Sequence, residues 1–453
     1  MKRRLPLQTW CLSLTVIAGI AAGSPDVRAA DWVQWRGPNH NGSTQASGLP
    51  VEFSKSKGVK WSVELPGPSP ATPIVVGERV FVSSMQGPDH ALMALALDRG
   101  TGKLLWKQQV GFGPPTDNRA NKAGPSPVCD GERVIFFYGT GELAAFGLDG
   151  KKLWQKNITR DHGDFAFLWT FCTSPLLHKG KLYIQVLQRD TPVNGRGGTK
   201  GGGPIPSFIL ALDPATGDVL VKHLRPAGAV SESLEAFTTP IVHTRSDGSE
   251  EIVIVGGDCL TGHEPGTLKE TWRWGTWNPK KIPHWRLVPS AVAGAGVILA
   301  CAPKGDPIYA IRADLTGDRS GDPQAVAWTS AGNAAVSSDV VSPAFHDGKF
   351  YVVRGEGRDK FLSCVEGATG KVLWSGKLPG KHLFRASPTV ADGKVYMIDY
   401  GGNVVVASAG PKFEILATAA LGEDGDDLIS ATPVVSGKNL FFRTNSRLFC
   451  IGE

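Results

Sequence analysis

The stretch ALDRGTGKLLW, residues 96–106, joins a Thr-Gly pair and a lysine to an apolar run, as a phosphate-binding loop does. A phosphate loop needs a longer glycine-rich turn that ends in Gly-Lys-Ser/Thr and leads into a helix, whereas here a Leu-Leu-Trp run continues as a second β-type segment. A motif repeated along a chain is typical of architecture, so we interpret the stretch as two strands and their turn. It recurs as ALDPATGDVLV at 211–221 and CVEGATGKVLW at 364–374, with degenerate copies at 146–154 and 263–272.

A second motif, opening with Ser/Thr-Pro, precedes each copy of the first. It predicts a strand, a tight hairpin and a second strand, because proline is tolerated at the first position of a strand and glycine supplies the turn. The two motifs together make a unit of four antiparallel strands, a to d, of about 45 residues, which is the size of a propeller blade. The copies begin at residues 72, 126, 174, 342, 387 and 432, with looser versions at 239 and 289.

The last strand of most units carries a tryptophan, which we expect to wedge between neighbouring blades. Trp61 lies ahead of the first strand a, and the last unit stops at Glu453 just after its strand c, so we expect the N-terminal strand to complete the last blade and remove a free sheet edge. The sequence therefore predicts an all-β, eight-bladed β-propeller of four-stranded antiparallel blades in a single domain, 30–453. The expected docking residues are Trp61, Trp106, Trp154, Trp272, Trp328 and Trp374, with Val221 and Leu416 at the same place in the other two blades.

The first 29 residues are typical of a secretory signal peptide. Three basic residues precede an apolar segment over 10–22, and Val27-Arg28-Ala29 is a small-x-small pattern, so we expect cleavage after Ala29 and a periplasmic or secreted chain. No later segment approaches the roughly 20 apolar residues of a membrane helix. Cleavage removes four basic residues and one acid and lowers the formal charge from +6 to +3, which excludes the basic signature of nucleic-acid-binding proteins.

The cysteines of the mature chain are scattered singly, with no CxxC, no CxxCH and no adjacent pair. Export permits disulfides, but most of these cysteines lie in apolar strand-like runs, where small buried hydrophobes are expected. They are Cys129, Cys172, Cys259, Cys301, Cys364 and Cys450.

The pattern Ala-x-Asp-x-x-Thr-Gly-x-x-x-Trp, in Ala96 to Trp106 and partly in Ala211 to Val221, resembles the docking motif of the pyrroloquinoline-quinone (PQQ) repeat superfamily, and the resemblance covers nearly all of the mature chain. The superfamily contains eight-bladed quinoprotein alcohol dehydrogenases and the non-enzymatic propeller lipoprotein of the outer-membrane barrel-assembly machine. The opening DWVQWRGPNHNGS at 31–43 is similar to that of exported propellers of this group, where its tryptophans are expected to cover a propeller face.

For an enzyme, the resemblance implies PQQ held on an aromatic floor beneath a disulfide between adjacent cysteines, with calcium bound by carboxylate and amide side chains and an aspartate as base. This sequence has no adjacent cysteines. The Asp-rich GEDGDD at 422–427 matches no defined calcium motif, and we interpret it as a solvated turn. We therefore predict no cofactor and no metal, with PQQ and Ca²⁺ only under the alternative function.

Every long insertion falls in a d-to-a or b-to-c connection, and these connections emerge on one face of a propeller, so we expect binding there. The loop 272–286 interleaves four tryptophans with basic residues and either stacks on a ligand or lids the blades. Charges ahead of each strand a either hold an anion or a metal at the central mouth or are solvated. The candidate residues are Lys122, Trp169, Glu235, Trp274, Trp277, His284, Trp285, Arg286, Asp339, Arg385 and Asp427.

These observations favour an exported binding or scaffolding module, expected to be a monomer, that engages an envelope protein or a glycan through the long-loop face. The alternative is a PQQ- and calcium-dependent oxidoreductase that uses the same face. A polysaccharide lyase or glycosidase is less favoured, because no paired carboxylates stand at a readable spacing.

Overall fold

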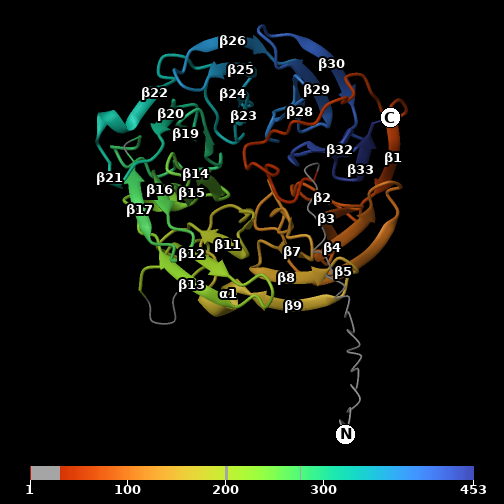
Figure 1. Cartoon of the computed structure of the whole chain (residues 1–453), viewed down its shortest axis with the longest axis horizontal. Helices are drawn as coiled ribbons and strands as arrows, with labels where there is room; N and C mark the ends of the chain where they lie inside the picture. Colours follow the sequence, from red (N-terminus) through yellow and green to blue (C-terminus); the bar gives the residue numbers. More distant parts are fainter. Residues whose placement is uncertain (2–30, 199–202, 276, 453) are drawn as a thin grey trace.

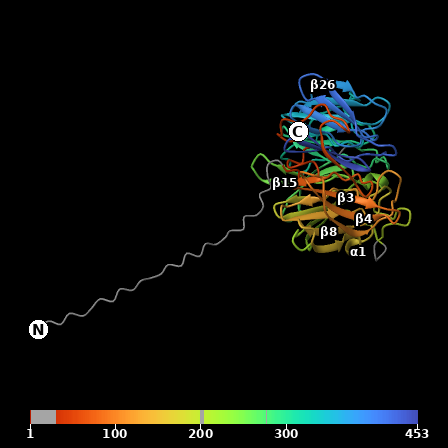
Figure 2. The same cartoon turned by 90° about the vertical axis from the view of Figure 1, so that its right-hand side faces the viewer.

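The computed structural model describes residue 1 and residues 31–198, 203–275 and 277–452. The signal peptide expected at 1–29 lies outside the described residues apart from Met1. Within the described part, eight antiparallel four-stranded sheets stand round a central axis, one of them with an added fifth strand, and strand order within the sheets follows the chain. Figure 1 shows the ring, and Figure 2 shows the disc from its side. The predicted eight-bladed propeller is confirmed.

Blades 1 to 4 use the first half of the chain. Blade 1 is β2 (Ile74–Val76), β3 (Arg79–Gln86), β4 (Ala91–Asp98) and β5 (Leu104–Phe112); blade 2 is β6 (Val128–Cys129), β7 (Arg133–Phe137), β8 (Glu142–Gly147) and β9 (Lys152–Asn157), followed by the short helix α1 (Ile158–His162). Blade 3 is β10 (Leu176–His178), β11 (Lys181–Val186), β12 (Phe208–Leu212) and β13 (Val219–Leu224); blade 4 is β14 (Ile241–Thr244), β15 (Glu250–Gly256), β16 (Cys259–His263) and β17 (Glu270–Trp274), with β21 (Gly317–Asp318) added in parallel.

Blades 5 to 8 complete the ring. Blade 5 is β18 (Val292–Gly294), β19 (Val297–Cys301), β20 (Ile308–Arg312) and β22 (Val326–Thr329); blade 6 is β23 (Ala344–His346), β24 (Lys349–Arg354), β25 (Phe361–Glu366) and β26 (Val372–Lys377). Blade 7 is β27 (Thr389–Ala391), β28 (Lys394–Ile398), β29 (Asn403–Ser408) and β30 (Ile415–Ala420); blade 8 is β31 (Val434–Ser436), β32 (Asn439–Arg443), β33 (Arg447–Ile451) and β1 (Val59–Glu64). Two 3₁₀ turns lie at Ser231–Leu234 and Pro323–Ala325.

The ring closes between the two ends of the chain, as predicted. β1 pairs antiparallel with β33, and Trp61 stands opposite Cys450. Figure 1 shows β1 beside the C-terminus at the outer edge of blade 8. Because the first strand of the domain covers the edge that the last strand leaves open, neither edge remains free.

The tryptophans of strand d join one blade to the next through a repeated hydrogen bond. In five blades the indole N–H donates to a carbonyl in the c-to-d turn of the following blade. In four of them, all but that of Trp374, the ring also lies against a turn glycine: a Cβ on Gly102 would lie 2.6 Å from Trp61, and a Cβ on Gly370 2.5 Å from Trp328. Both glycines have positive φ, so any side chain there meets strain as well as overlap. The five bonds are Trp61 to Arg99 (2.9 Å), Trp106 to Leu148 (3.1 Å), Trp154 to Pro214 (2.9 Å), Trp328 to Gly367 (2.8 Å) and Trp374 to Gly410 (2.8 Å).

The interface between blades 3 and 4 is built differently. The docking tryptophan is replaced by Val221, and the turn glycine that would receive it is replaced by Leu268. Leu268 keeps the positive φ of the turn, at 58°, and is fully buried in the apolar cluster against which Val221 packs. A smaller residue on one side is thus matched by a larger one on the other, which conserves packed volume.

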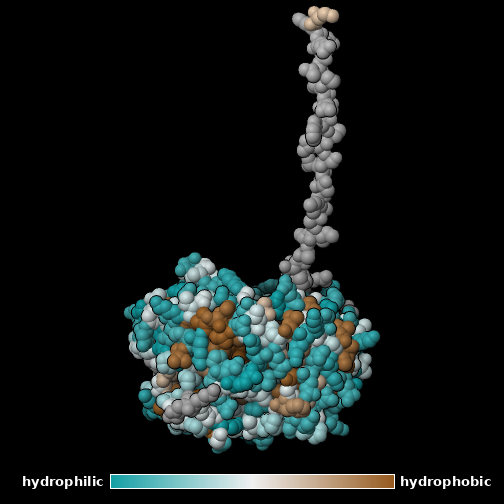
Figure 3. Space-filling model, turned by 90° about the horizontal axis from the view of Figure 1, so that it is seen from below, coloured by the Kyte–Doolittle hydropathy of each residue, from teal (hydrophilic) through white to brown (hydrophobic). Residues whose placement is uncertain are grey.

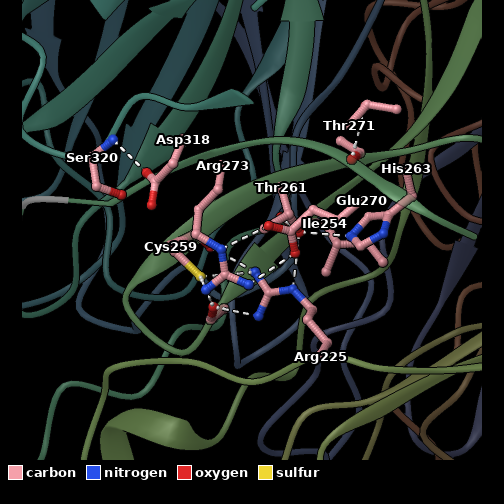
Figure 4. Close-up of polar contacts among 12 residues, drawn as sticks. Arg225, Ile254, Cys259, Thr261, His263, Glu270, Thr271, Arg273, Asp318 and Ser320 are labelled. Atoms are coloured by element: carbon pink, nitrogen blue, oxygen red, sulfur yellow. Dashed lines mark hydrogen bonds and ion pairs between the residues drawn. The ribbon is translucent and has the colours of Figure 1, made fainter. Parts of the chain in front are cut away.

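A buried arginine adds polar contacts to the same interface (Figure 4). Arg225 follows β13, is 1% exposed, and donates from Nε to Thr261 Oγ1 (2.9 Å), from Nη1 to Gly256 O (2.9 Å) and from Nη2 to Cys259 O (3.0 Å). Burial holds the pKa of its guanidinium below the ordinary value. These bonds tie blade 3 to blade 4 where the indole bond of the regular interfaces is missing.

The residues ahead of β1 close one end of the central channel. They run along the inner strands of the ring, and Arg36 lies 1% exposed with Nη1 donating to Pro388 O (2.9 Å) and Nη2 to Pro343 O. Burial lowers the pKa of Arg36 to about 9. The backbone bonds follow the blade order: Trp32 with Val75 (2.8 and 3.0 Å), Cys129 to Val33 (3.0 Å), Phe345 to Asn41 (3.0 Å) and Val390 to Gly42 (2.9 Å). We call residues 31–44 the N-terminal plug.

The outer rim carries exposed leucines among polar residues. Leu153 of β9 is 48% exposed, and Leu220 and Leu224 of β13 are 52% and 54% exposed. Figure 3, seen from the side of these strands, shows apolar side chains gathered on the rim. The long loops and the channel, not the rim, bring charged residues together.

Candidate functional site

The loops ahead of strand a surround a cavity of about 440 Å³ at the central axis, on the long-loop face. Its floor includes Trp35 of the N-terminal plug, and its walls come from the loops that lead into blades 2, 3, 4, 5, 6, 7 and 8. The tryptophans at the start of the chain therefore cover the channel, as expected from the sequence: Trp32 is fully buried beside β2, and Trp35 lies below the cavity.

A belt of hydroxyl groups encircles the lower part of the cavity. Each belongs to the Ser or Thr that stands before the first residues of strand a, and each accepts a hydrogen bond from the corresponding backbone N–H of the preceding blade. The bonds of the described residues are Thr72 to Ser126 (3.0 Å), Ser126 to Ser174 (3.0 Å), Ser174 to Thr239 (3.2 Å), Thr239 to Ser290 (2.8 Å), Ser290 to Ser342 (2.9 Å), Ser342 to Ser387 (3.1 Å) and Thr432 to Thr72 (3.0 Å). The belt spaces the blades evenly round the axis.

Above this belt, one arginine joins two carboxylates across the cavity wall. Arg286 lies 3.7 Å from Glu232 and 3.4 Å from Asp339, and the backbone N–H of Lys304 donates to Asp339 at 2.8 Å. Burial alone would raise the pKa of Asp339, but Arg286 and the N–H and ammonium groups of Lys304 together outweigh it and hold this pKa below its ordinary value. Burial, with repulsion from Arg286, lowers the pKa of the Lys304 ammonium. Asp339 is therefore an ionised anchor at physiological pH.

Two further arginines lie against aromatic rings of the same cavity. The guanidinium of Arg119 lies 5.4 Å from the centroid of Trp169, and that of Arg385 lies 5.7 Å from the centroid of Tyr400. Arg385 also donates to Glu356 at 3.1 Å, whereas Arg119 has no ion pair within the described part of the chain. A cation stacked on a ring keeps its N–H donors free at the edge of the guanidinium plane. The pair can therefore receive an anionic or hydrogen-bond-accepting ligand.

The structure brings five of the sequence-predicted residues to this cavity. They are Trp169, His284, Arg286, Asp339 and Arg385, and they come from four different loops. Trp169 is oriented by its own N–H, which donates to Glu232 Oε1 at 3.0 Å. Whether these residues bind a ligand stays a prediction.

Two predicted residues lie behind the cavity wall. Glu235 is fully buried, accepts from Leu168 N at 3.1 Å and pairs with Arg189; burial raises the pKa of its carboxyl to about 7. Lys122 is half-buried, and burial, with repulsion from Arg196, lowers its pKa to about 8. Both groups stand at the inner ends of their loops, where they support the wall from behind.

Four predicted residues lie away from it. Of the two readings of the 272–286 loop, the structure agrees with rings that cover the blade: Trp274 and Trp277, predicted as binding residues, are 0% and 5% exposed, and their ring centroids lie 5.4 Å apart in the core of blade 4. Trp285 is half-buried against the same core. Large rings at the end of β17 gain more by packing on the sheet than by contacting water. Asp427 is exposed and lines a separate cavity of about 260 Å³.

Other residues of the cavity were not predicted. They lie in b-to-c turns or deeper in the long loops, where nothing in the sequence except the length of the loop marks a site. They come together only because the ring places these loops round one axis. A charged or aromatic residue just after strand b was the available signal for Lys304 and Tyr400. The set is Asp117, Arg119, Glu232, Lys304 and Tyr400.

The cavity does not fit the cofactor set that the resemblance implies for a dehydrogenase. Trp35 and Trp169 supply aromatic surface, but the six cysteines of the described residues are free, and Cys172, the one beside the cavity, has its pKa raised to about 12 by burial. In the described ranges no group of three or more His, Cys, Asp or Glu side chains is arranged to hold a metal ion. The disulfide lid and the calcium ligands are therefore not supplied by this chain's side chains. Among the described residues, no helix has the length and apolarity to cross a membrane.

Comparison with known proteins places the chain among PQQ-type propellers. It is 29% identical over 131 residues to a polyvinylalcohol dehydrogenase of Pseudomonas sp, over 28% of this chain and 18% of that protein, and 26% identical over 215 residues to the polyvinylalcohol dehydrogenase of Sphingopyxis sp. strain 113P3, over 44% of this chain and 29% of that protein. The matched region thus spans less than a third of either relative's length.

Solved structures share the fold at low identity. The quinohemoprotein alcohol dehydrogenase from Comamonas testosteroni matches with a TM-score of 0.65 at 14% identity, over 93% of this chain and 80% of that one. A europium-containing methanol dehydrogenase matches with a TM-score of 0.65 at 13% identity, over 94% and 98% of the two chains, and BamB from Moraxella catarrhalis with 0.59 at 13%, over 87% and 99%. The likeness covers enzymes and an assembly factor alike. The family model described as outer membrane protein assembly factor BamB matches residues 43–189 and 318–411, more than half of the chain, and the chain therefore belongs to this family of PQQ-like repeat propellers.

Proposed function

We propose that this protein is an exported binding module that engages an anionic group of an envelope protein or glycan in the central cavity of its long-loop face. The observation that carries the proposal is the pair of arginines stacked on aromatic rings, Arg119 on Trp169 and Arg385 on Tyr400. Stacked guanidinium groups present a fork of donors that matches a carboxylate, while the rings offer a surface to a sugar or an apolar side chain.

The remaining charges of the cavity set its preference. Its lining holds four cations and three carboxylates, of which Glu232 and Asp339 are already paired with Arg286. Arg286 and Lys304 thus offset Glu232 and Asp339 within the wall, and the third carboxylate, Asp117, accepts hydrogen bonds from Thr170. The donors left over are those of Arg119 and, in part, Arg385. A ligand that brings negative charge completes this arrangement, whereas a cationic ligand meets repulsion.

The alternative is a PQQ- and calcium-dependent oxidoreductase, which the names of the curated relatives support. The side chains of the cavity favour binding over this reading, because they supply neither adjacent cysteines nor a set of metal ligands among the described residues. Export, a monomeric state and the partner class belong to the same proposal.

The test is calorimetric titration of the purified protein with three probes: an oligogalacturonate, a peptide of alternating Glu and Ala, and PQQ with CaCl₂. We expect an acidic probe to bind, and Arg119→Gln and Arg385→Gln each to weaken it at least about tenfold, as loss of a charge-assisted contact does. Lys438→Gln is the matched control. Lys438 lies in the turn between β31 and β32 of blade 8, on the other face, and this variant should bind as the unaltered protein does.

Two outcomes contradict the proposal. Binding of PQQ with calcium, seen as quinone absorbance together with dye-linked alcohol oxidation, would establish the oxidoreductase alternative. Acidic probes that bind the arginine variants and the unaltered protein equally would place the function outside the central cavity.

A further inference from the structure

The N-terminal plug forms backbone hydrogen bonds with the inner strands of blades 1, 2, 6 and 7. In blade 3 the side chain of Gln34 accepts from Leu177 N instead. In blade 1 the N–H and the C=O of Val75 both bond to Trp32, and equivalent N–H groups of blades 2, 6 and 7 donate to the plug. The equivalent residues of blades 4 and 5 are Val242 of β14 and Ala293 of β18. Within the described residues, no backbone bond joins the plug to either of them. Their inner-edge peptide groups are therefore open.

A cavity lies at this place. It has a volume of about 390 Å³ on the face opposite the long loops, between the plug residues Asn39 and His40 and the first hairpins of blades 4 and 5. Small residues of blade 5, from Ala293 to Gly296, hollow out one wall, and residues 241–246 of blade 4 form the other. The open peptide groups thus lie on the walls of a cavity large enough for a short peptide segment.

The blade 4 wall carries a histidine and an arginine that are both held by a buried carboxylate. Glu251 is 2% exposed and accepts from His243 Nδ1 (2.9 Å), from Arg245 Nη1 (2.9 Å) and from the indole of Trp272 (2.7 Å). Burial alone would raise the pKa of Glu251, but the hydrogen bonds from these partners outweigh it and hold that pKa below its ordinary value. The bonds use Nδ1 of His243 and Nη1 of Arg245, which donates to Leu315 O (3.2 Å) as well. Nη2 of Arg245 is left as a further donor, and Nε2 of His243 is a second polar atom of a residue that lines the cavity.

The other titratable groups at this cavity are already engaged or neutral. Asp314 accepts from Ser246 N at 3.1 Å and lies 3.9 Å from Arg245 Nε. Burial lowers the pKa of His40 to about 4, so His40 is uncharged at neutral pH. The guanidinium of Arg245 is therefore the charged donor left to meet a ligand, and it favours an oxyanion, with Nε2 of His243 beside it on the same wall.

We propose that this cavity binds the C-terminal carboxylate of an extended peptide. The carboxylate lies against Arg245 and His243, and the peptide backbone pairs with the open inner edges of β14 and β18, as the plug pairs with blades 1, 2, 6 and 7. The open edges supply both N–H donors and C=O acceptors, which a peptide matches and a bare anion does not. The proposal is independent of the function proposed for the central cavity, because the two sites lie on opposite faces and share no residue.

The experiment is isothermal titration calorimetry of the full purified protein with tri-alanine, with tri-alanine amide and with inorganic phosphate. We expect the free acid to bind, and the amide and phosphate each to bind at least tenfold more weakly. His243→Gln and Arg245→Gln should each weaken the acid tenfold or more. His178→Gln is the matched control: His178 bonds Glu250 at 2.7 Å on the neighbouring blade, outside the cavity, and its loss should leave binding unchanged.

A further variant tests the same cavity without disturbing the contacts of Glu251, in case the first two variants do not fold. Ala313 lines the cavity and is half-buried, and Ala313→Asp adds a negative charge there without removing a contact of Glu251. We expect it to weaken the acid and to leave the melting temperature within a few degrees. Equal binding of acid and amide, phosphate binding as tight as the acid, or acid binding that survives all three cavity variants would each overturn the proposal. Arg119→Gln and Arg385→Gln leave this cavity intact. Failure of the proposal for the central cavity would therefore appear only in the titrations of those two variants with acidic probes, and not in the titrations with tri-alanine.

Discussion

Blades 4 and 6 carry a tryptophan at the same place in strand d, yet the two indoles do different things. Trp374 of blade 6 stands opposite Cys364, and its N–H donates to Gly410 of the next blade at 2.8 Å. Trp272 of blade 4 stands opposite Gly262, and its N–H donates to Glu251 of its own blade at 2.7 Å. One indole docks blades, and the other anchors a buried carboxylate.

The residue opposite the tryptophan decides which course the ring takes. A Cβ on Gly262 would lie 1.9 Å from the indole nitrogen of Trp272, so only glycine lets this ring fold back over its own sheet. The chain of blade 5 then adds β21 to the outer edge of blade 4, where Trp272 pairs with Gly317. At the regular interfaces, the c-to-d turn of the following blade offers a backbone carbonyl to the indole N–H. Blade 5 has no such regular turn at this interface. Blade 4 therefore lacks the indole hydrogen bond that docks other blades to the next one. Its indole instead helps to hold Glu251, which bonds His243 and Arg245 of the cavity between blades 4 and 5.

The largest expected effect tests the docking role. Trp374→Ala removes a ring that is 8% exposed and packs near Tyr351 and Phe413, so unfolding should become about 3–5 kcal/mol easier, as for other large buried aromatics. The neighbour Leu373 is 37% exposed, and Leu373→Ala should cost under about 1 kcal/mol. Urea unfolding followed by fluorescence gives both values. Equal losses in the two variants would deny the tryptophan its wedge role.

The anchoring role predicts a loss of similar origin at Glu251. Glu251→Gln leaves Arg245 and His243 without their buried counter-charge, and we expect a cost of about 3 kcal/mol. Glu250, next in the chain, pairs with His178 and Lys179 at 21% side-chain exposure, and Glu250→Gln should cost about 1 kcal/mol or less. The same unfolding experiment compares them, and a cost below 1 kcal/mol for Glu251→Gln contradicts its role as an anchor.

A smaller effect tests the position opposite the ring. Gly262→Ala places a methyl group against Trp272 and should cost about 1–3 kcal/mol, the range of overpacked cores. Cys364→Ala introduces the same residue at the same register position of blade 6, where the indole points away, and should cost under about 1.5 kcal/mol. If both variants behave alike, the glycine does not steer the indole.

The smallest effect is a dependence on pH. The folded-state pKa of Glu251 lies below the ordinary 4.5, so its contribution to stability is present above pH 4.5 and is lost as the pH falls through the lower, folded value. We expect Glu251→Gln to lack that part of the acid-induced loss of stability, because the glutamine side chain does not titrate. Melting temperatures from pH 3 to 6 show whether the two acid limbs differ; parallel curves would mean that Glu251 titrates as in the unfolded chain.

The repeats predict the propeller because each blade is defined locally. The Ser/Thr-Pro start, the Gly turn and the strand d tryptophan repeat along the chain, and the placement of Trp61 ahead of the first strand a was enough to predict the closure by β1 and β33. The position of most long loops likewise predicts the face that holds the cavity of about 440 Å³. The expectation that every long insertion lies on that face is wrong for blade 5, whose c-to-d connection spans residues 313–325 and contributes β21 to blade 4.

The candidate site was predicted in part. Arg286, Asp339 and Arg385 were found because they stand just ahead of a strand a, which fixes their distance from the axis, and His284 because it lies in the 272–286 loop. Trp274 and Trp277 were misplaced, since a loop rich in tryptophan looks the same in sequence whether its rings stack on a ligand or pack on the sheet beneath.

The sequence by itself determined the blade count and the closure, because these depend on residues at fixed places within a repeat. Only the tertiary structure decided which charges meet, because Arg119 and Arg385 come from loops more than 260 residues apart and are brought together by the ring alone. It also decided that the plug serves some blades and leaves β14 and β18 open, since one segment of irregular backbone cannot match every inner strand of an eight-fold ring.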